Sequence, residues 1–320
     1  MTGFLIVIAI LLALIICLTL GIYNYTFVHK MKDHFDPFIM TDFDKNYYGA
    51  FTDEMLASSK RMEETEHKHV FIKSDDGLRL NGHLYNSFEG RPIVIFFHGY
   101  HGSYLRDGYG TFRYCMDHKL NLLMIEQRAH CKSEGEVISF GINERKDACK
   151  WVEYVKSIIP KDTKIILAGV SMGAATVMMT SDLVDNDPHI LCYIEDCGYT
   201  SPKEIIKNTA ASTSELLKYC YPLAKLAAKI LGHFDLESAS AIESVSKISK
   251  PMLFIHGSND GFVPTPMCKV LFNACSSENK KMCIIKDAEH AISALVGYDE
   301  YEKAVTEFLT SVDGGNYGLN

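Results

Sequence analysis

A serine flanked by glycines follows a short apolar run and precedes a helical pattern. The apolar run covers residues 164–168, the segment 169–173 reads Gly-Val-Ser-Met-Gly, and the helical pattern continues to residue 184. A strand, a sharp turn and a helix in this order hold a serine in a strained backbone conformation at the end of a sheet. Side chains at Gly169 and Gly173 would collide with the neighbouring strand or helix, so both glycines are required by the shape of the turn.

Continuous apolar runs alternate with helical patterns along most of the chain. The runs cover 93–97, 120–125, 164–168, 191–194, 252–255 and 282–285, and the helical patterns cover 143–159, 172–184, 264–274 and 298–309. Strands buried on both faces of a parallel sheet have this character. Two earlier strand-like runs, 69–73 and 78–85, flank an Asp-Gly pair, which is a hairpin signal. The sequence therefore predicts an α/β fold with a mostly parallel sheet that opens with an antiparallel hairpin.

The interval 199–250 is much longer than an ordinary connection in such a fold, which takes about 2 to 6 residues. Its segment 216–231 carries a wide apolar helical face. We expect a helical cap insertion that lies over the sheet and the substrate. The alternative is a helix that packs on the side of the domain without touching substrate.

The first residues differ in character from the rest. Residues 4–22 are nineteen residues without a charged side chain, and a helix of that length spans about 28 Å, close to the thickness of a bilayer core. The start of the chain carries no basic residue and no cleavage site follows the apolar segment. We predict an uncleaved, single-pass transmembrane anchor over 1–28; a cleaved signal sequence and a buried core helix are the alternatives.

The remaining organisation is a connector over 29–67 with one amphipathic helix near 51–62, an α/β domain over 68–312 and a C-terminal tail over 313–320. Lys30 and Lys32 favour a cytoplasmic domain by the positive-inside rule, but Asp33 and Asp36 beside them weaken the signal, so the side of the membrane stays open. Nine of the ten cysteines lie outside the anchor without regular spacing, unlike a disulfide framework.

The composition limits the partners. The formal net charge is −8 and no run rich in lysine and arginine occurs, so nucleic acid is not an expected partner. No Walker loop and no dinucleotide G-x-G-x-x-G follows the first parallel strand. The His, Cys and Glu residues of 126–135 match no zinc spacing, so a loop-bracing ion pair of Arg128 is the preferred interpretation. We therefore predict no cofactor and no metal.

A serine nucleophile requires a histidine that accepts its proton and a carboxylate that orients the imidazole. Asp260 follows the run 252–255, 89 residues after Ser171, and His290 follows the next run, 30 residues further on. This chain order and the position at the carboxyl ends of strands predict a Ser171, Asp260, His290 triad. Asp196 is the rival acid and Glu195 a weaker one.

An oxyanion hole requires backbone N–H donors beside the nucleophile. The residue after the serine supplies one donor and the loop after an early strand supplies another. We predict the N–H groups of Met172 and Tyr100, and we expect His98 to brace the loop rather than transfer protons.

Four segments together resemble the α/β-hydrolase superfamily, and the likeness covers residues 68–312. They are His-Gly-Tyr-His-Gly-Ser at 98–103, Gln-Arg-Ala-His at 127–130, Gly-Val-Ser-Met-Gly-Ala-Ala-Thr at 169–176 and His-Gly-Ser-Asn-Asp-Gly-Phe-Val-Pro at 256–264. More narrowly they are similar to membrane-anchored bacterial hydrolases of the serine aminopeptidase-like and acyltransferase or thioesterase-like kinds. The resemblance implies the same triad without a metal or organic cofactor. Cys131 departs from the usual glycine and Glu126 from the usual aspartate of their loop.

The expected function is a serine hydrolase that cleaves carboxylic esters or thioesters through an acyl-enzyme, with the anchor holding the site near small acylated or lipid-like substrates. The alternatives are a serine peptidase of the aminopeptidase-like kind, an acyltransferase, and a non-catalytic membrane-tethered scaffold. The complete triad in the expected order argues against the scaffold.

Overall fold

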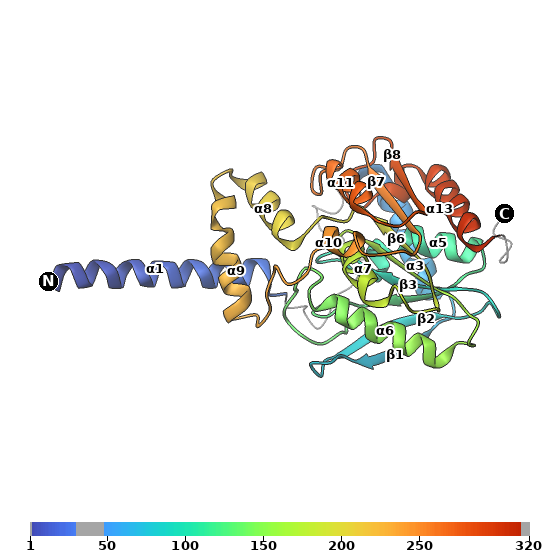
Figure 1. The fold of residues 1–320 in the computed structure, drawn as a ribbon, viewed down its shortest axis with the longest axis horizontal. Helices are drawn as coiled ribbons and strands as arrows, with labels where there is room; N and C mark the ends of the chain where they lie inside the picture. The colour runs from blue at the N-terminus through green and yellow to red at the C-terminus, as the bar shows by residue number, and fades with distance from the viewer. Residues whose placement is uncertain (1, 30–47, 315–320) are drawn as a thin grey trace.

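The computed structural model describes residues 2–29 and 48–314 (Figure 1). Within this part of the chain, eight strands form one sheet in the order β1-β2-β4-β3-β5-β6-β7-β8. Strands β1 and β2 pair antiparallel, β2 pairs antiparallel with β4, and every later pair is parallel. The strands are β1 (Lys68–Lys73), β2 (Arg79–Tyr85), β3 (Ile93–Phe97), β4 (Asn121–Ile125), β5 (Ile165–Val170), β6 (Ile190–Asp196), β7 (Met252–Gly257) and β8 (Lys280–Ile285). The predicted mostly parallel sheet with an opening hairpin is confirmed.

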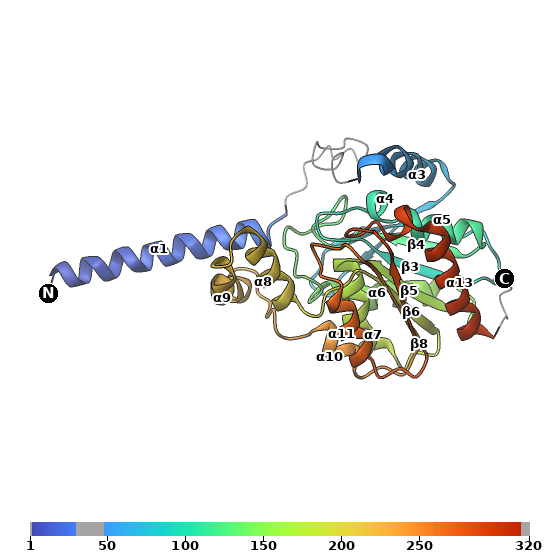
Figure 2. The ribbon, with the colours of Figure 1, turned by 90° about the horizontal axis from the view of Figure 1, so that it is seen from above.

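Helices cover both faces of the sheet (Figure 2). One buried cluster packs α6, α7 and α11 against one face, and a second packs α3, α5 and α13 against the other. Strands β3, β4, β5 and β7 are fully buried, which is why they read as continuous apolar runs. The covering helices are α3 (Thr52–Glu64), α4 (Tyr104–Asp107), α5 (Tyr109–Asp117), α6 (Glu144–Ile158), α7 (Met172–Val184), α11 (Pro266–Ala274), α12 (Ser293–Val296) and α13 (Tyr298–Asp313).

A long apolar helix, α1 (Thr2–Thr26), projects from the body (Figure 1). It is long and apolar enough to cross a membrane, and its side chains up to Leu18 are exposed. Its end merges with the domain core, because Phe27 is fully buried and packs edge-on against Phe140 and Phe234, with ring centroids 5.9 Å and 5.6 Å away. The Tyr100 hydroxyl donates to the Thr26 carbonyl at 3.1 Å.

The predicted helical insertion forms α8 (Pro202–Thr213), η2 (Leu217–Cys220), α9 (Tyr221–Ile230) and α10 (Ala241–Val245). Helix α10 packs on α7, whereas α9 packs against α1. Helix α9 runs across α1 in Figure 1 and is seen nearly end-on in Figure 2. The Tyr23 hydroxyl donates to the Leu231 carbonyl at 3.3 Å, joining the two segments. The insertion therefore extends beyond the sheet as far as α1.

The connector predicted over 29–67 lies partly outside the described residues, which omit 30–47. Before that gap, Val28 forms an antiparallel bridge with Val137 and the His29 N–H donates to the Glu136 carbonyl at 2.8 Å. After it, a short turn η1 (Gly49–Phe51) leads into α3, the amphipathic helix expected near 51–62. Most of the C-terminal tail, 315–320, also lies outside the described residues.

Candidate active site

The turn between β5 and α7 has the strained form that the sequence predicts. Ser171 has φ 54° and ψ −116°, in the left-handed region that a serine rarely adopts. A Cβ on Gly169 would lie 2.4 Å from the Gly173 backbone, and a Cβ on Gly173 would lie 1.9 Å from the Phe97 carbonyl oxygen. The two glycines therefore allow helix α7 to start directly against β3 and β5.

Replacing Gly173 by alanine is expected to lower the free energy of unfolding by about 3 kcal/mol, because the new methyl group meets backbone atoms that cannot rotate away. Gly261→Ala is the matched control, since a Cβ there meets no atom within 4 Å, and we expect a change below about 0.5 kcal/mol. Denaturant unfolding of both full-length variants in detergent micelles measures the difference. Equal unfolding midpoints for the two variants would contradict the close contact between Gly173 and the Phe97 backbone.

The three predicted triad residues meet at the carboxyl ends of their strands. His290 Nε2 lies 2.8 Å from the Ser171 hydroxyl oxygen, and His290 Nδ1 lies 2.7 Å from Asp260 Oδ2. Ser171 follows β5, Asp260 follows β7 and His290 follows β8. The Ser171 side chain is buried and that of His290 is 15% exposed, so the hydroxyl is recessed but the imidazole borders solvent. The geometry is that of a nucleophile, a base and an orienting acid.

Asp260 is held in its charged form by hydrogen bonds. Its Oδ1 accepts from the backbone N–H groups of Phe262 at 2.9 Å and Val263 at 2.8 Å. Burial alone would raise the pKa of this carboxyl, but hydrogen bonds from His256 and His290 outweigh burial and lower the pKa to about 2. The carboxylate is therefore ionised at neutral pH and is suited to stabilise a protonated His290.

The two rival acids have other partners. Asp196 accepts a hydrogen bond from the Ser293 hydroxyl at 3.0 Å, and its backbone carbonyl accepts the Ser171 N–H at 2.8 Å. Glu195 accepts the Gly198 N–H at 2.8 Å. Burial raises the pKa of Asp196 to about 6 and that of Glu195 to about 8. Both carboxyl groups therefore contribute to the structure around the serine turn, and the acid at His290 Nδ1 is Asp260.

The two predicted oxyanion donors belong to the two segments that border the serine. Met172 is the first residue of α7, so its N–H is among the four that a helix leaves without an internal acceptor. A Cβ on Gly99 would lie 3.8 Å from the Ser171 hydroxyl oxygen, so the loop after β3 borders the nucleophile. The Gly99 N–H donates to Asp107 and the His101 N–H to His130. Within the described residues, no such bond occupies the Tyr100 N–H, which stays available for an oxyanion.

His98 connects the oxyanion loop to the next loop. Its Nε2 accepts the Gln127 N–H at 3.0 Å, so Nδ1 carries the proton and donates to the Gly99 carbonyl at 2.9 Å. The Gln127 side chain donates back to the His98 carbonyl at 2.6 Å. Burial lowers the pKa of His98, which favours the neutral form that this bonding needs. The expected bracing role matches these contacts.

The loop after β4 is fixed by the buried guanidinium of Arg128. It donates to Asp147 at 2.6 and 2.8 Å and to Asp76 at 2.9 and 3.1 Å. Cys131, which replaces the glycine usual in similar chains, has φ 49°. A left-handed conformation costs a non-glycine residue about 1–2 kcal/mol. The chain therefore keeps the turn that glycine favours, at some cost in stability, and the triad is unaffected.

Two supporting residues were missed from the sequence. His256 Nε2 lies 3.3 Å from Asp260 Oδ2 and 2.8 Å from the Val263 carbonyl, and it fixes the loop that carries the acid. Asp107 accepts the Gly99 N–H at 2.8 Å and shapes the oxyanion loop. A histidine inside the apolar run of β7 was the available signal for His256. No sequence pattern predicts the contact of Asp107, which lies eight residues after Gly99.

No protein-family model matches the chain. It is 26% identical to the uncharacterized protein YqkD of Bacillus subtilis, over 88% of this chain and 91% of that protein. It is 24% identical to the alpha/beta hydrolase domain-containing protein WAV2 of Arabidopsis thaliana, over 75% of this chain and 77% of that protein. The Pyrococcus furiosus esterase Pf2001 superposes with a TM-score of 0.65 at 21% identity, over 90% of this chain and 98% of the esterase. The chain therefore has the α/β-hydrolase fold.

Proposed function

We propose that this protein is a membrane-anchored serine hydrolase that cleaves carboxylic esters or thioesters of small lipid-like molecules. The observation that carries the proposal is the continuous hydrogen-bond chain from the Ser171 hydroxyl through His290 to Asp260, with links of 2.8 and 2.7 Å. The strained backbone of Ser171 supports it, because strain at a polar residue is typical of catalytic turns. Esterases such as Pf2001 share the fold.

The first half of the reaction forms an acyl-enzyme. The Ser171 oxygen attacks the acyl carbon while its proton passes to His290 Nε2, and Asp260 stabilises the imidazolium through Nδ1–H. The carbonyl oxygen becomes an oxyanion that accepts hydrogen bonds from the N–H groups of Met172 and Tyr100. Collapse of this intermediate breaks the bond to the leaving alcohol or thiol, which takes the proton from His290.

The second half releases the acid. A water molecule gives its proton to His290 Nε2 and attacks the acyl carbon, and the same two N–H groups stabilise the second oxyanion. Collapse breaks the bond to the Ser171 oxygen, which recovers its proton from His290. The carboxylic acid leaves and the hydrogen-bond chain is restored.

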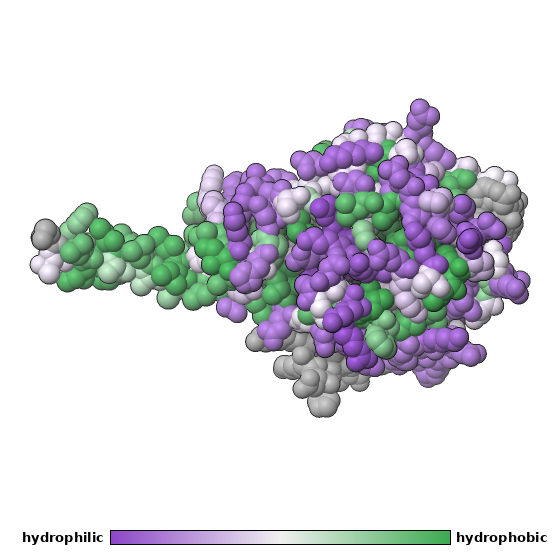
Figure 3. All heavy atoms as spheres, turned by 60° about the horizontal axis from the view of Figure 1, so that its bottom comes forward, coloured by the Kyte–Doolittle hydropathy of each residue, from purple (hydrophilic) through white to green (hydrophobic). Residues whose placement is uncertain are grey.

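The position of α1 supports a membrane location for this chemistry. The Tyr100 side chain of the oxyanion loop bonds to Thr26 at the end of α1, so the catalytic edge of the sheet faces the base of the apolar helix. In Figure 3 the apolar surface of α1 continues onto the body where the helix joins it. The insertion also exposes several apolar side chains, namely Leu216, Leu217, Tyr219, Leu226 and Ile230. Burial of Phe27 in the core favours an anchor that is retained over a signal sequence that is removed.

An apolar acyl group suits the entrance to the site. Phe262 is 45% exposed, and its ring centroid lies 5.0 Å from that of His290. An exposed aromatic ring next to the base offers an apolar contact to a chain bound at Ser171. A lipid that diffuses in the bilayer would approach this edge of the sheet from the side of α1.

The test uses the full-length protein in lipid nanodiscs with para-nitrophenyl esters of two to twelve acyl carbons, an acyl thioester, and an aminoacyl para-nitroanilide. We expect ester and thioester turnover that rises with acyl length, slow or no anilide cleavage, and covalent labelling of Ser171 by a fluorophosphonate. Labelling with anilide cleavage and no ester turnover would replace the esterase proposal by a peptidase. Absence of labelling in folded protein would favour the scaffold.

A further inference from the structure

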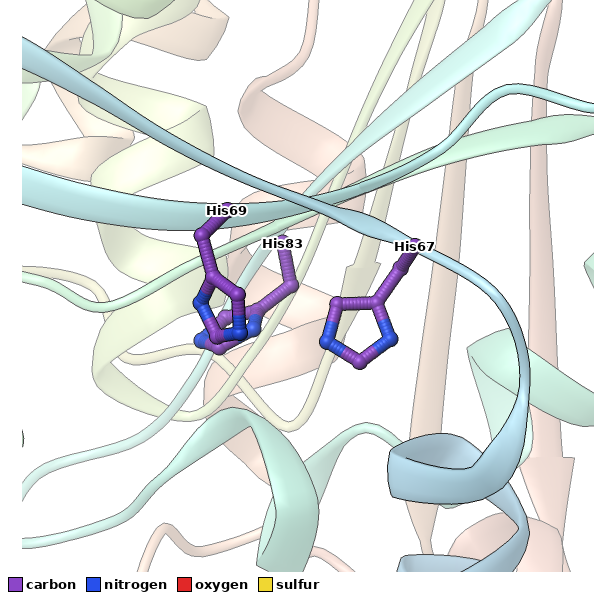
Figure 4. A group of neighbouring side chains, drawn as sticks. All are labelled: His67, His69 and His83. Carbon is purple, nitrogen blue, oxygen red and sulfur yellow. The ribbon is translucent and has the colours of Figure 1, made fainter.

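Three histidines meet at the edge of the sheet, on the opening hairpin (Figure 4). His69 in β1 and His83 in β2 are direct partners in the antiparallel register, and His67 immediately precedes β1. One nitrogen from each imidazole lies within 4.8 Å of the others. Figure 4 shows a ring nitrogen of His67 turned toward the other two rings. Partners across an antiparallel pair project on the same face, so the hairpin itself brings these side chains together.

The hydrogen bonds leave His83 and His67 each with one ring nitrogen that can accept. His83 Nε2 is 2.8 Å from Glu126 Oε1, so Nε2 carries the proton, and Nδ1 is left as an acceptor. That Nδ1 is buried and has no hydrogen-bond partner in the described part of the chain, although His83 is only 2% exposed. His67 Nδ1 lies 2.7 Å from the Thr65 carbonyl and must donate to it, so its Nε2 also presents a lone pair.

A purely structural role explains this arrangement poorly. A buried acceptor without a partner costs free energy that a protein normally avoids by a hydrogen bond or a bound ligand. His83 is otherwise fixed tightly, since the Tyr104 ring stacks on it with centroids 3.9 Å apart.

We propose that His67, His69 and His83 form a binding site for a divalent transition-metal ion, with Zn²⁺ as the best match. Zinc usually binds four ligands in a tetrahedron, with zinc–imidazole nitrogen distances of about 2.0–2.1 Å, and a water molecule would be the fourth ligand of a three-histidine site. His67 is partly exposed and His69 is exposed, so their side chains can close around an ion that the fixed His83 holds. Glu126 supplies the carboxylate that typically orients a metal-binding histidine through its second nitrogen.

Such a site would link the edge hairpin to the loops around Ser171. The second oxygen of Glu126 accepts the Lys132 N–H at 2.6 Å, and the Glu126 carbonyl accepts the Ser133 hydroxyl at 2.6 Å. Gln127 is the next residue and bonds to His98 of the oxyanion loop. The metal is therefore placed as a structural clamp on the hairpin and the loop after β4, and it takes no part in the acyl transfer.

The test is a titration of chelator-treated, full-length protein in detergent with Co²⁺, whose visible spectrum reports its ligands, followed by displacement with Zn²⁺. We expect one Co²⁺ per chain, a tetrahedral spectrum without a thiolate charge-transfer band, and tighter binding of Zn²⁺. His69→Ala should weaken Zn²⁺ binding about 100-fold or more, because it removes a ligand from an exposed position without disturbing the core. Zn²⁺ should raise the melting temperature of the wild type and not that of this variant.

His233→Ala is the matched control, since His233 is an exposed histidine outside the cluster, and we expect unchanged affinity. Equal affinity in the wild type and His69→Ala would overturn the site, as would a cobalt spectrum dominated by thiolate. Absence of stoichiometric binding to the folded wild type would also overturn it. These readouts do not depend on catalysis, so the metal site and the hydrolase proposal can fail separately.

Discussion

Ser171→Ala is expected to lower the kcat for ester hydrolysis by about 10⁶-fold, because no other group can form the acyl-enzyme once the hydroxyl is lost. The oxyanion donors and the substrate contacts would remain, so a residual acceleration of about 10³–10⁴-fold over water should persist. The variant keeps the backbone of the turn. Its melting temperature should match or exceed that of the wild type, because the strained serine is part of a site that is costly in stability.

The measurement is para-nitrophenyl ester turnover by the wild type and Ser171→Ala in nanodiscs, together with fluorophosphonate labelling. Ser157→Ala is the control, since Ser157 is exposed on α6 and its hydroxyl donates to the Tyr154 carbonyl of the same helix. It should label and turn over like the wild type. Turnover by Ser171→Ala within tenfold of the wild type would mean that Ser171 is not the nucleophile.

Asp260→Asn is expected to lower kcat by about 10⁴-fold while leaving the fold intact. An asparagine amide facing His290 Nδ1 would favour the tautomer with the proton on Nε2, which then cannot accept the serine proton. The 2.7 Å bond between His290 Nδ1 and Asp260 Oδ2 is the contact that the substitution changes. The backbone bonds to Oδ1 from Phe262 and Val263 can still be made by the amide oxygen.

The comparison with Asp196→Asn decides between the two acids. Asp196 accepts a hydrogen bond from the Ser293 hydroxyl, and the amide oxygen of an asparagine can accept the same bond. We therefore expect kcat to fall by less than about tenfold. Circular dichroism and melting curves of both variants check that the fold is retained. A larger loss of kcat in Asp196→Asn than in Asp260→Asn would reverse the assignment.

Sequence reasoning is effective here where a pattern is local. The runs that became β3, β5 and β7 are apolar because both of their faces are buried, and this property is visible in a few consecutive residues. The serine turn is equally local, because Gly169 and Gly173 are required by contacts within one strand–turn–helix unit. Asp260 and His290 follow from the rule that strand ends meet at one edge of the sheet.

Contacts between distant segments were not predictable in this way. The sequence analysis treated 29–67 as a connector and assigned no role to the histidines at its end, because neither register nor packing partners can be read from one strand alone. The pairing of His69 with His83 depends on the hairpin register. The packing of α9 against α1 joins segments about 200 residues apart, and only the folded chain brings them together.

The burial of Phe27 has a consequence for how the protein explores its surroundings. A domain on a long flexible linker can occupy a large volume and can bind substrates from solution at varying distances from the membrane. Here Phe27 lies between Phe140 and Phe234, and Val28 is paired with Val137, so α1 and the body move as one unit. With α1 in a bilayer, the body would stay at a constant height above the membrane and at a constant tilt, and it would rotate only about the membrane normal. Its supply of substrate would then depend on lateral diffusion within the leaflet. A soluble form that begins after residue 28 would also lack the Phe27 ring, and its free energy of unfolding would fall by about 3–5 kcal/mol.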